Sequence, residues 1–352
     1  MDLSGLYQRV GAWLDETGPV NDIVISSRVR LARNLAGFFF CGQADEAQQR
    51  QVLEFVREKL TATDVQGSLW YVPMEQVTAL QRQVLTERHL ISRELAETGG
   101  PRAVALTPDE SLAVMVNEED HLRIQMMANG LQLRETYERI CRVDEQLEGQ
   151  VEYAFSAEYG YLTACPTNTG TGMRVSVMLH LPALKMTGEI EKVLRAAKDL
   201  RLAVRGLYGE GSEPVGDFYQ LSNQTALGKT EEQIIDDLTR HAVEPMVEYE
   251  RRARKKLSEG KATALDDKIF RAKGILSHAR MVSSEEALYL LSYIRLGIHL
   301  GRFRDVRMST VNRLFLTAQP AHLQTLFGED LDAGGRDRAR ADYIRRELAG
   351  AA

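Results

Sequence analysis

Alternating apolar and polar residues mark several segments of the chain as half-buried strands. In residues 173–181 every second side chain is apolar, and in residues 23–34 Val29 and Leu31 alternate with Arg28 and Arg30, so one face of each strand should pack on a core while the other carries polar groups. In the later segment the apolar face is Val175, Val177, Leu179 and Leu181, and the polar face is Arg174, Ser176, Met178 and His180. Shorter strands are predicted at residues 101–106, 111–116, 151–155, 202–207 and 218–223.

Apolar residues at helical spacing predict the helices between these strands, at residues 46–63, 75–85, 131–147 and 189–200. From Thr230 onward the pattern is helical throughout. Thr230 and Gln233 form a capping box, and Ser283 caps another helix. The basic residues 251–256 and the polar residues that follow indicate a domain junction. We therefore expect one domain at residues 1–255 and an all-helical domain at residues 256–352.

Composition narrows the class of protein. With 352 residues, 44% of them hydrophobic, the chain can bury one large core or two moderate ones. Its net charge of −6 argues against a general nucleic-acid binder. Cys41, Cys141 and Cys165 are odd in number and lack C-x-x-C spacing, which favours a reducing, cytoplasmic location over a disulfide framework or zinc knuckle. The most apolar late segment, 288–300, is interrupted by Arg295, so neither export nor a membrane span is expected.

Arginines stand on predicted strands from four regions of the chain. A single pair on a strand is most simply a solvated face. If all of them share one concave face, however, their repulsion and desolvation demand an anionic partner. Guanidinium forks match phosphate oxygens, so the ligand we expect is a nucleotide triphosphate. The residues concerned are Arg28, Arg30, Arg123, Arg174 and Arg205.

Residues 117–126 alternate charged and apolar side chains. If this segment stays extended, Glu119, His121, Arg123 and Gln125 line one face, with Glu119 and Arg123 about 13 Å apart along the strand. These two groups would hold opposite ends of one substrate complex, and a surface salt-bridge ladder is the alternative. The Gly-rich segment 206–216 is too short and too acidic for a Walker loop, and we expect a mobile flap there.

Four motifs, in consistent order between residues 23 and 245, resemble the phosphagen (guanidino) kinases. They are S-S-R-V-R-L-A-R-N at 26–34, V-N-E-E-D-H-L-R at 116–123, C-P-T-N-x-G-T at 165–171 and L-S-N at 221–223. The resemblance implies an α+β fold in which an antiparallel sheet is flanked by helices, with ATP and Mg²⁺ on the arginine face and no dedicated metal-ligand set. The nucleotide contacts that it implies are Ser26, Ser27, Arg28, Val29, Arg30, His89 near the adenine, Arg123, Arg174, Val175, Ser176, Val177, Met178, Arg205, Gly206, Leu207, Tyr208, Gly209 and Glu210.

The same resemblance makes Glu119 the catalytic carboxylate, Glu213 its partner on the flap and Cys165 the thiol beside the acceptor guanidinium. Physical chemistry agrees with these roles. A guanidinium with a pKa above about 12 is no nucleophile until a positioned base takes a proton from it. A second carboxylate can align the planar group. An isolated cysteine is usually a small buried hydrophobe, but nearby arginines favour its thiolate.

Two departures indicate which guanidino kinase the chain resembles. Only about twenty residues precede the first arginine-bearing strand, so we expect the small domain that encloses free arginine or creatine to be missing and the acceptor site to be open. Tyr208 stands where the metabolite enzymes usually carry a phosphate-contacting arginine.

In the C-terminal domain Arg336 and Arg340 lie one turn apart on a predicted helix, which by itself indicates a solvated face.

The sequence R-D-x-x-R-A at 336–341 is, however, similar to the phosphoarginine-binding motif of the bacterial protein-arginine kinases, which assigns that role to Arg336, Asp337, Arg340 and Ala341. The resemblance implies a cytoplasmic stress role with protein substrates, a Clp-type AAA+ protease, a heat-shock repressor and a zinc-binding activator as partners. We also expect a homodimer. A kinase for free arginine and a non-catalytic phosphoarginine-binding adaptor remain the alternatives.

Overall fold

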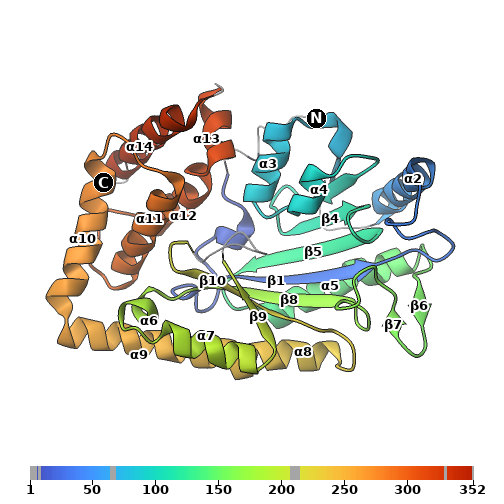
Figure 1. Cartoon of the computed structure of the whole chain (residues 1–352), viewed down its shortest axis with the longest axis horizontal. Coiled ribbons are helices and arrows are strands. Elements are labelled where there is room, and N and C mark those ends of the chain that lie inside the picture. The colour runs from blue at the N-terminus through green and yellow to red at the C-terminus, as the bar shows by residue number, and fades with distance from the viewer. Residues whose placement is uncertain (1–5, 7–8, 64–68, 207–214, 329–330, 351–352) are drawn as a thin grey trace.

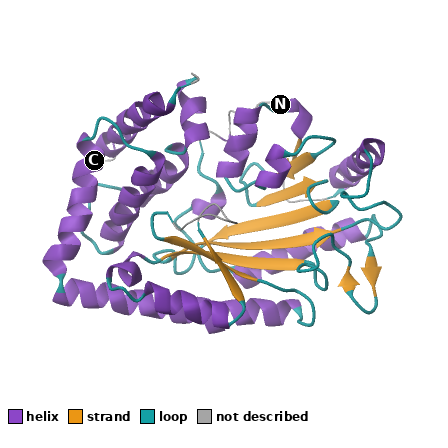
Figure 2. Ribbon diagram, in the orientation of Figure 1, coloured by secondary structure: helices purple, strands orange, loops and turns teal. Residues whose placement is uncertain are grey.

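The N-terminal part of the protein is built on an eight-stranded antiparallel sheet. The computed structural model describes residue 6 and residues 9–63, 69–206, 215–328 and 331–350. Strand order across the sheet is β2-β3-β4-β5-β1-β8-β10-β9 (Figures 1 and 2). The strands are β1 Val24–Arg33, β2 Trp70–Pro73, β3 Ala103–Leu106, β4 Leu112–Val116, β5 Leu122–Asn129, β8 Met173–His180, β9 Leu202–Arg205 and β10 Phe218–Asn223. The sheet confirms the predicted fold class.

Strand register separates a polar face of the sheet from an apolar one. Arg30 on β1 lies opposite Gln125 on β5 and Arg174 on β8, and directly opposed residues in antiparallel strands share a face. Val29 lies opposite Met126 and Val175 in the same way, on the other face. The helices α5 (Leu133–Glu148) and α8 (Glu231–Leu238) pack against the apolar face, which leaves the arginine face uncovered by them.

Helices lie beside the sheet at both of its ends. At the β2 edge lie α2 (Glu46–Ala62), α3 (Ala79–Glu87) and α4 (Arg93–Glu97), and α6 (Pro182–Met186) and α7 (Ile190–Asp199) follow β8. The C-terminal part holds α10 (Ala262–His278), α11 (Ser284–His299), α12 (Met308–Thr317), α13 (Pro320–Phe327) and α14 (Ala333–Gly350), which stand together beside one end of the sheet (Figure 1). None of the described helices is long and apolar enough to cross a membrane.

The predicted division at residue 255 falls inside one helix, α9 (Glu244–Gly260). Arg254 of this helix is buried, donates to Glu250 at 2.9 Å and lies 3.5 Å from Asp22, near the start of the sheet. The basic cluster therefore contributes to the packing of α9 as well as to its solvent face. The division into 1–255 and 256–352 remains a prediction.

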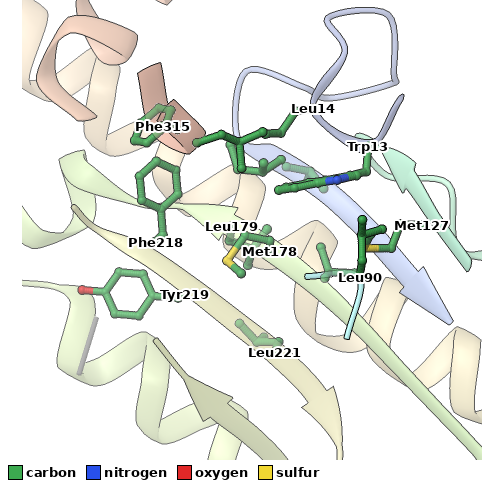
Figure 3. Close-up of a cluster of buried hydrophobic side chains, with 14 of the residues drawn as sticks. Trp13, Leu14, Leu90, Met127, Met178, Leu179, Phe218, Tyr219, Leu221 and Phe315 are labelled. Atoms are coloured by element: carbon green, nitrogen blue, oxygen red, sulfur yellow. The ribbon is translucent and has the colours of Figure 1, made fainter. Parts of the chain in front are cut away.

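Hydrophobic side chains join the sheet to the C-terminal helices. Phe218 of β10 meets Phe315 of α12 edge-on, with ring centroids 4.9 Å apart, and both are buried (Figure 3). Trp13 and Leu14, from a short 3-10 helix (Ala12–Leu14), are buried in the same cluster. The C-terminal helices are therefore held against the sheet by a continuous core.

Several local predictions were accurate and others were wrong. The capping box at Thr230 and the cap at Ser283 are both present, and β10 has the predicted bounds. The helix predicted at residues 75–85 begins later, as α3, after a 3-10 turn at Met74–Gln76. Residues 117–121 form a turn, because β5 starts only at Leu122. The strand predicted at 151–155 reduces to the short pair Phe155–Ser156 (β6) and Gly160–Tyr161 (β7).

Candidate active site

A cleft of about 1770 Å³ lies over the arginine face of the sheet. Its floor is formed by β1, β5, β8 and β9, and one wall by α3 and α4. Another part of the wall comes from the first residues of α11 and the junction between α12 and α13, so both halves of the chain contribute to the cleft. The lining includes Arg28, Arg30, His89, Glu118, Glu119, Arg123, Cys165, Asn168, Arg174, Arg205, Ser284, Glu285, Leu288, Gln319 and Pro320.

The predicted arginines from four strands meet on the floor of this cleft. Arg28 donates from Nε to Ser176 Oγ at 3.2 Å, and Arg174 donates to Ser222 Oγ at 3.1 Å. Burial, followed by the charges of Arg123, Arg174 and Arg205, lowers the pKa of Arg28 to about 9. Burial and the neighbouring cations also lower the pKa of Arg30 well below its usual range. Such shifts express unfavourable electrostatics that a bound polyanion would relieve.

Arg30 carries a buried donor for such an anion. Its Nε has no hydrogen-bond partner among the described residues and is shielded from solvent. A buried donor without an acceptor costs free energy, so its presence at the floor of an open cleft favours a ligand that supplies acceptor oxygens.

Four of the ten implied nucleotide contacts on β1 and β8 point away from the cleft. Ser27, Val29, Val175 and Val177 lie on the opposite face, where the Ser27 hydroxyl donates to Gly130 O at 2.8 Å. The reason is the two-residue period of a strand, which sends alternate side chains to opposite faces. On the cleft face, Ser26 lies opposite Met178, and Met178 lines a small separate cavity of about 40 Å³. Gly206 is buried at the end of β9, and Leu207, Tyr208, Gly209, Glu210 and Glu213 lie outside the described residues.

His89 lines the cleft at the end of α3. Its backbone is left-handed, with φ of 58°, and its carbonyl accepts a 2.7 Å hydrogen bond from Gln125 Nε2. The ring meets Trp13 edge-on at 5.4 Å. Burial, followed by the charge of Arg28, lowers the pKa of His89 to about 3, so the imidazole is neutral at physiological pH. A neutral aromatic ring at this position suits an adenine base.

Glu119 lies in the turn between β4 and β5 and is exposed to the cleft. The prediction that Glu119, His121, Arg123 and Gln125 line one strand face is wrong at its first two residues, because the turn removes them from the strand. His121 is buried elsewhere: its Nδ1 accepts from Leu35 N at 3.0 Å, so its Nε2 donates to Phe39 O at 2.9 Å. Partial burial, together with Asp120 and Glu118, raises the pKa of Glu119. A raised pKa makes Glu119 a more competent general base.

The neighbouring carboxylate, Glu118, was missed in the sequence. It is buried, forms an ion pair with Arg123 and accepts from Ser92 Oγ at 2.5 Å. Burial acts to raise its pKa, but Arg123 and the hydrogen bonds outweigh it, and the net pKa is lowered. Glu118 therefore stays ionised and orients Arg123. The adjacent carboxylates of the N-E-E-D motif were the available signal.

Asp120 connects the Glu119 turn to the Cys165 loop. One of its carboxylate oxygens accepts from Asn34 Nδ2 and from Ala164 N, both at 2.6 Å, and His121 N donates to Asn34 Oδ1 at 2.9 Å. Cys165 is half-buried at the cleft, with its sulfur 3.0 Å from Thr167 Oγ1. Asp120 thus holds the base and the thiol in a fixed relation, although the sequence analysis gave it no role.

Replacing Asp120 with alanine should reduce the free energy of unfolding by about 2 kcal/mol, because two donors lose a charged acceptor. We also expect kcat to fall about tenfold, since the two loops lose their connection. Asp120→Asn keeps the accepting oxygen and is the matched control, with a smaller loss of both quantities. Chemical denaturation and steady-state kinetics measure them. Equal kcat values for Asp120→Ala and wild type would contradict a positioning role.

The C-terminal motif is less exposed than its helical spacing predicts. Arg340 is almost fully buried and donates to Ala318 O, Val282 O and Asp337 Oδ1 at 2.7, 2.8 and 2.7 Å. Arg336 is half-buried and donates to Leu331 O at 2.7 Å. The alternative interpretation, a solvated face that carries both arginines, therefore does not hold for Arg340, because α14 packs this side against the other helices. Ala341 is also buried.

The sheet and the arginine-lined cleft match a known class of enzyme. A family model described as the ATP:guanido phosphotransferase C-terminal catalytic domain matches residues 51–253. The duplicated taurocyamine kinase from Schistosoma mansoni, with bound transition-state analogue components, is similar with a TM-score of 0.60 and 28% identity, over 70% of this chain and 35% of its own. A lombricine kinase structure has a TM-score of 0.57 and 26% identity, over 70% of both chains. This chain thus spans about a third of the duplicated enzyme. By class it is an ATP-dependent guanidino phosphotransferase.

The remaining part of the chain and the full-length relatives narrow the class further. A model described as the protein-arginine kinase McsB C-terminal domain matches residues 262–352. Proteins named protein-arginine kinase from Halalkalibacterium halodurans and Halothermothrix orenii are each 45% identical, over 97% and 99% of this chain and 96% and 99% of their own. The chain belongs to the protein-arginine kinase family.

Proposed function

We propose that the cleft binds ATP along its floor and transfers the γ-phosphoryl group to an arginine side chain of a protein substrate. The observation that carries this proposal is the convergence of five arginines from four strands on a floor that ends beside Glu119 and Cys165. The cationic floor suits the triphosphate, and the neutral ring of His89 suits the adenine. The implied roles of Ser26, Arg123, Arg174, Ser176 and Arg205 as nucleotide contacts accord with their places on the cleft face.

In the proposed reaction the carboxylate of Glu119 takes a proton from the acceptor guanidinium as its nitrogen attacks the γ-phosphorus. An N–P bond forms, the bond from phosphorus to the bridging oxygen breaks, and ADP leaves with the electron pair. The arginines neutralise the charge that spreads over the transferring group, which supplies much of the rate together with in-line positioning. Cys165 would lie beside the acceptor guanidinium, and Glu213 would be the second aligning carboxylate.

The cleft also fits a magnesium nucleotide. Among the described residues, no three His, Cys, Asp or Glu side chains form a metal cluster. Mg²⁺ in kinases takes most of its ligands from phosphates and water and only one or two carboxylates from the protein. Glu119, whose exposed carboxylate faces the cleft, is an oxygen donor of that kind. The ion would supply charge neutralisation on the phosphates.

We further propose that the R-D-x-x-R-A motif binds phosphoarginine, with Asp337 receiving the guanidinium and Arg336 the phosphate. Arg336 and Asp337 are half-buried, whereas Arg340 is engaged with backbone carbonyls. The family resemblance supports a cytoplasmic stress role in which the modification marks proteins for a Clp-type protease and inactivates a heat-shock repressor. It also supports control by a zinc-binding activator and a homodimeric state.

Two measurements test these proposals. ATP-dependent, acid-labile phosphorylation of arginine on a model protein, found by intact-mass analysis, is the expected result. Transfer to free arginine alone would instead support a metabolite kinase, and absence of both would leave the adaptor interpretation.

For the second site, Asp337→Ala should abolish binding of phosphoarginine in calorimetry. Asp342→Ala lies on the same helix and also pairs with an arginine three residues on, so it is the matched control and should bind normally. Unchanged binding by Asp337→Ala would contradict the assignment.

A further inference from the structure

Part of the wall of the cleft belongs to the C-terminal helices, and it is attached through residues that have no part in the proposed phosphoryl transfer. Two segments form it: the start of α11, with Ser284, Glu285 and Leu288, and the α12–α13 junction, with Gln319 and Pro320. Each segment begins a helix, so the backbone just before each helix fixes where this wall stands. Contacts to those two short backbone segments therefore hold this part of the wall in place.

Glu87 docks the second of these segments onto the catalytic half. Its carboxylate accepts from Ala321 N at 2.8 Å and from His322 N at 3.0 Å, which are free amides in the first turn of α13. The same carboxylate accepts from His322 Nδ1 at 2.7 Å. Figure 1 shows α3 and α13 side by side, and the bonds join residues more than 230 positions apart.

The residues on either side of Glu87 extend this contact into the core and the cleft. Arg88 is buried, donates bidentately to the buried Glu110, and contacts His322 Nε2 at 3.2 Å. Because His322 Nδ1 donates to Glu87, its Nε2 is the acceptor for Arg88. The next residue is His89, which lines the cleft. Three consecutive residues therefore have distinct contacts. Glu87 binds the start of α13, Arg88 forms a buried ion pair, and His89 is the proposed adenine contact.

Arg340 holds both wall segments from the other side. Its Nε donates to Ala318 O, one residue before the α13 cap, and its Nη1 donates to Val282 O, one residue before the α11 cap. The backbone of α14 adds a bond from Val282 N to Asp337 O at 3.1 Å. The buried guanidinium of Arg340 thus binds the backbone just before α11 and just before α13, and it holds the starts of these two helices at a fixed separation.

We infer that Glu87 and Arg340 are positioning residues for the kinase reaction, which set the affinity of the cleft for ATP by fixing the starts of α11 and α13. This inference rests on the proposed binding of ATP to the arginine floor. It also gives the R-D-x-x-R-A motif a direct mechanical connection to the nucleotide, because Arg340 and Asp337 belong to that motif.

The direction in which ATP affinity changes distinguishes a positioning role of Glu87 from a purely electrostatic one. Glu87 lines the cleft, so removing its negative charge should strengthen binding of the ATP anion if charge alone matters. Positioning predicts the opposite: Glu87→Gln keeps one acceptor oxygen but places an amide NH2 group against the second α13 N–H, so one of the two bonds is lost and the wall moves. We expect Glu87→Gln to weaken ATP binding about fivefold to tenfold, with kcat and the KM for the protein substrate changed less than twofold.

The experiment uses the full chain with magnesium ATP in titration calorimetry and steady-state kinetics. Glu87→Gln, Arg340→Lys and the double variant are compared with Glu58→Gln and Arg338→Ala, two exposed controls that should behave as wild type. Because both positions hold the α13 start, the fold-change of the double variant should be smaller than the product of the single ones. If Arg340→Lys does not fold, Glu87→Gln alone tests the inference, because glutamine has nearly the same volume as glutamate.

Unchanged or tighter ATP binding by Glu87→Gln would overturn the inference, as would a loss confined to kcat. Titration of Arg28→Met with ATP distinguishes a failure of the positioning inference from a failure of the proposed function. If Arg28→Met loses ATP affinity and Glu87→Gln does not, only the positioning role is wrong. If neither variant loses affinity, the arginine floor is not the nucleotide site and both proposals are wrong.

Discussion

Replacing Glu119 with alanine is expected to lower kcat for arginine phosphorylation about 10³-fold, within the range for loss of a general base. The reason is the acceptor itself, since a guanidinium remains protonated and non-nucleophilic at neutral pH unless a carboxylate takes its proton. Glu119 is the exposed carboxylate of the turn that faces the cleft, and its neighbours Glu118 and Asp120 are engaged in other contacts. Acid-labile phosphoryl transfer to a model protein, followed by intact mass, is the measurement.

The pH profile provides an independent signature of the same base. Because partial burial and the nearby carboxylates raise the pKa of Glu119, activity should fall as pH drops through a value above the usual range for glutamate. Glu119→Gln preserves shape without basicity and should lose as much activity as Glu119→Ala, with an unchanged melting temperature. If Glu119→Gln retained more than about a tenth of wild-type kcat, another group would have to be the base.

The second large effect is expected at Arg28, where one substitution should change two quantities in opposite directions. Arg28→Met removes a phosphate partner and should weaken ATP binding at least about 30-fold, the loss expected for charge-assisted hydrogen bonds. It also removes one of five mutually repelling cations, so the free energy of unfolding without ATP should rise by about 1 kcal/mol. Calorimetry with ATP and denaturation without it test the two parts.

Arg271→Met is the control for this pair of measurements, because Arg271 is an exposed helix residue paired with Asp267. It should leave both the ATP affinity and the unfolding free energy nearly unchanged. A loss of stability together with a loss of ATP affinity at Arg28 would show that the floor arginines are structural. In that case their lowered pKa values would not reflect a ligand site.

Periodicity along the chain was sufficient for most of the fold. The alternation at residues 23–34 and 173–181 predicted β1 and β8 with their arginines on one face, because a strand sends successive side chains to opposite sides. Capping chemistry located the starts of α8 and α11. The signals are local, so they can be read without knowing what packs against each segment.

Local patterns failed where a turn or a distant partner intervened. Residues 117–126 keep a period of two, but the turn at 117–121 places Glu119 at the end of a hairpin and His121 in the core. Arg340 has the spacing of a solvated helix residue, and its burial depends on carbonyls 22 and 58 positions earlier. The periodicity of a sequence does not reveal hydrogen-bond partners that lie so far away along the chain.

By itself, then, the sequence determined the strands, their polar face and the residue types that a guanidino phosphotransferase needs, because propensity and side-chain period act within a few residues. Only the tertiary structure decided how those residues meet. Sheet order brings arginines from four strands onto one floor, and Asp120 joins the Glu119 turn to the Cys165 loop. Glu87 binds the start of α13 from more than 230 residues away, and Arg340 binds the backbone before α11 from 58 residues away. Those contacts depend on packing between distant segments, which no local pattern encodes.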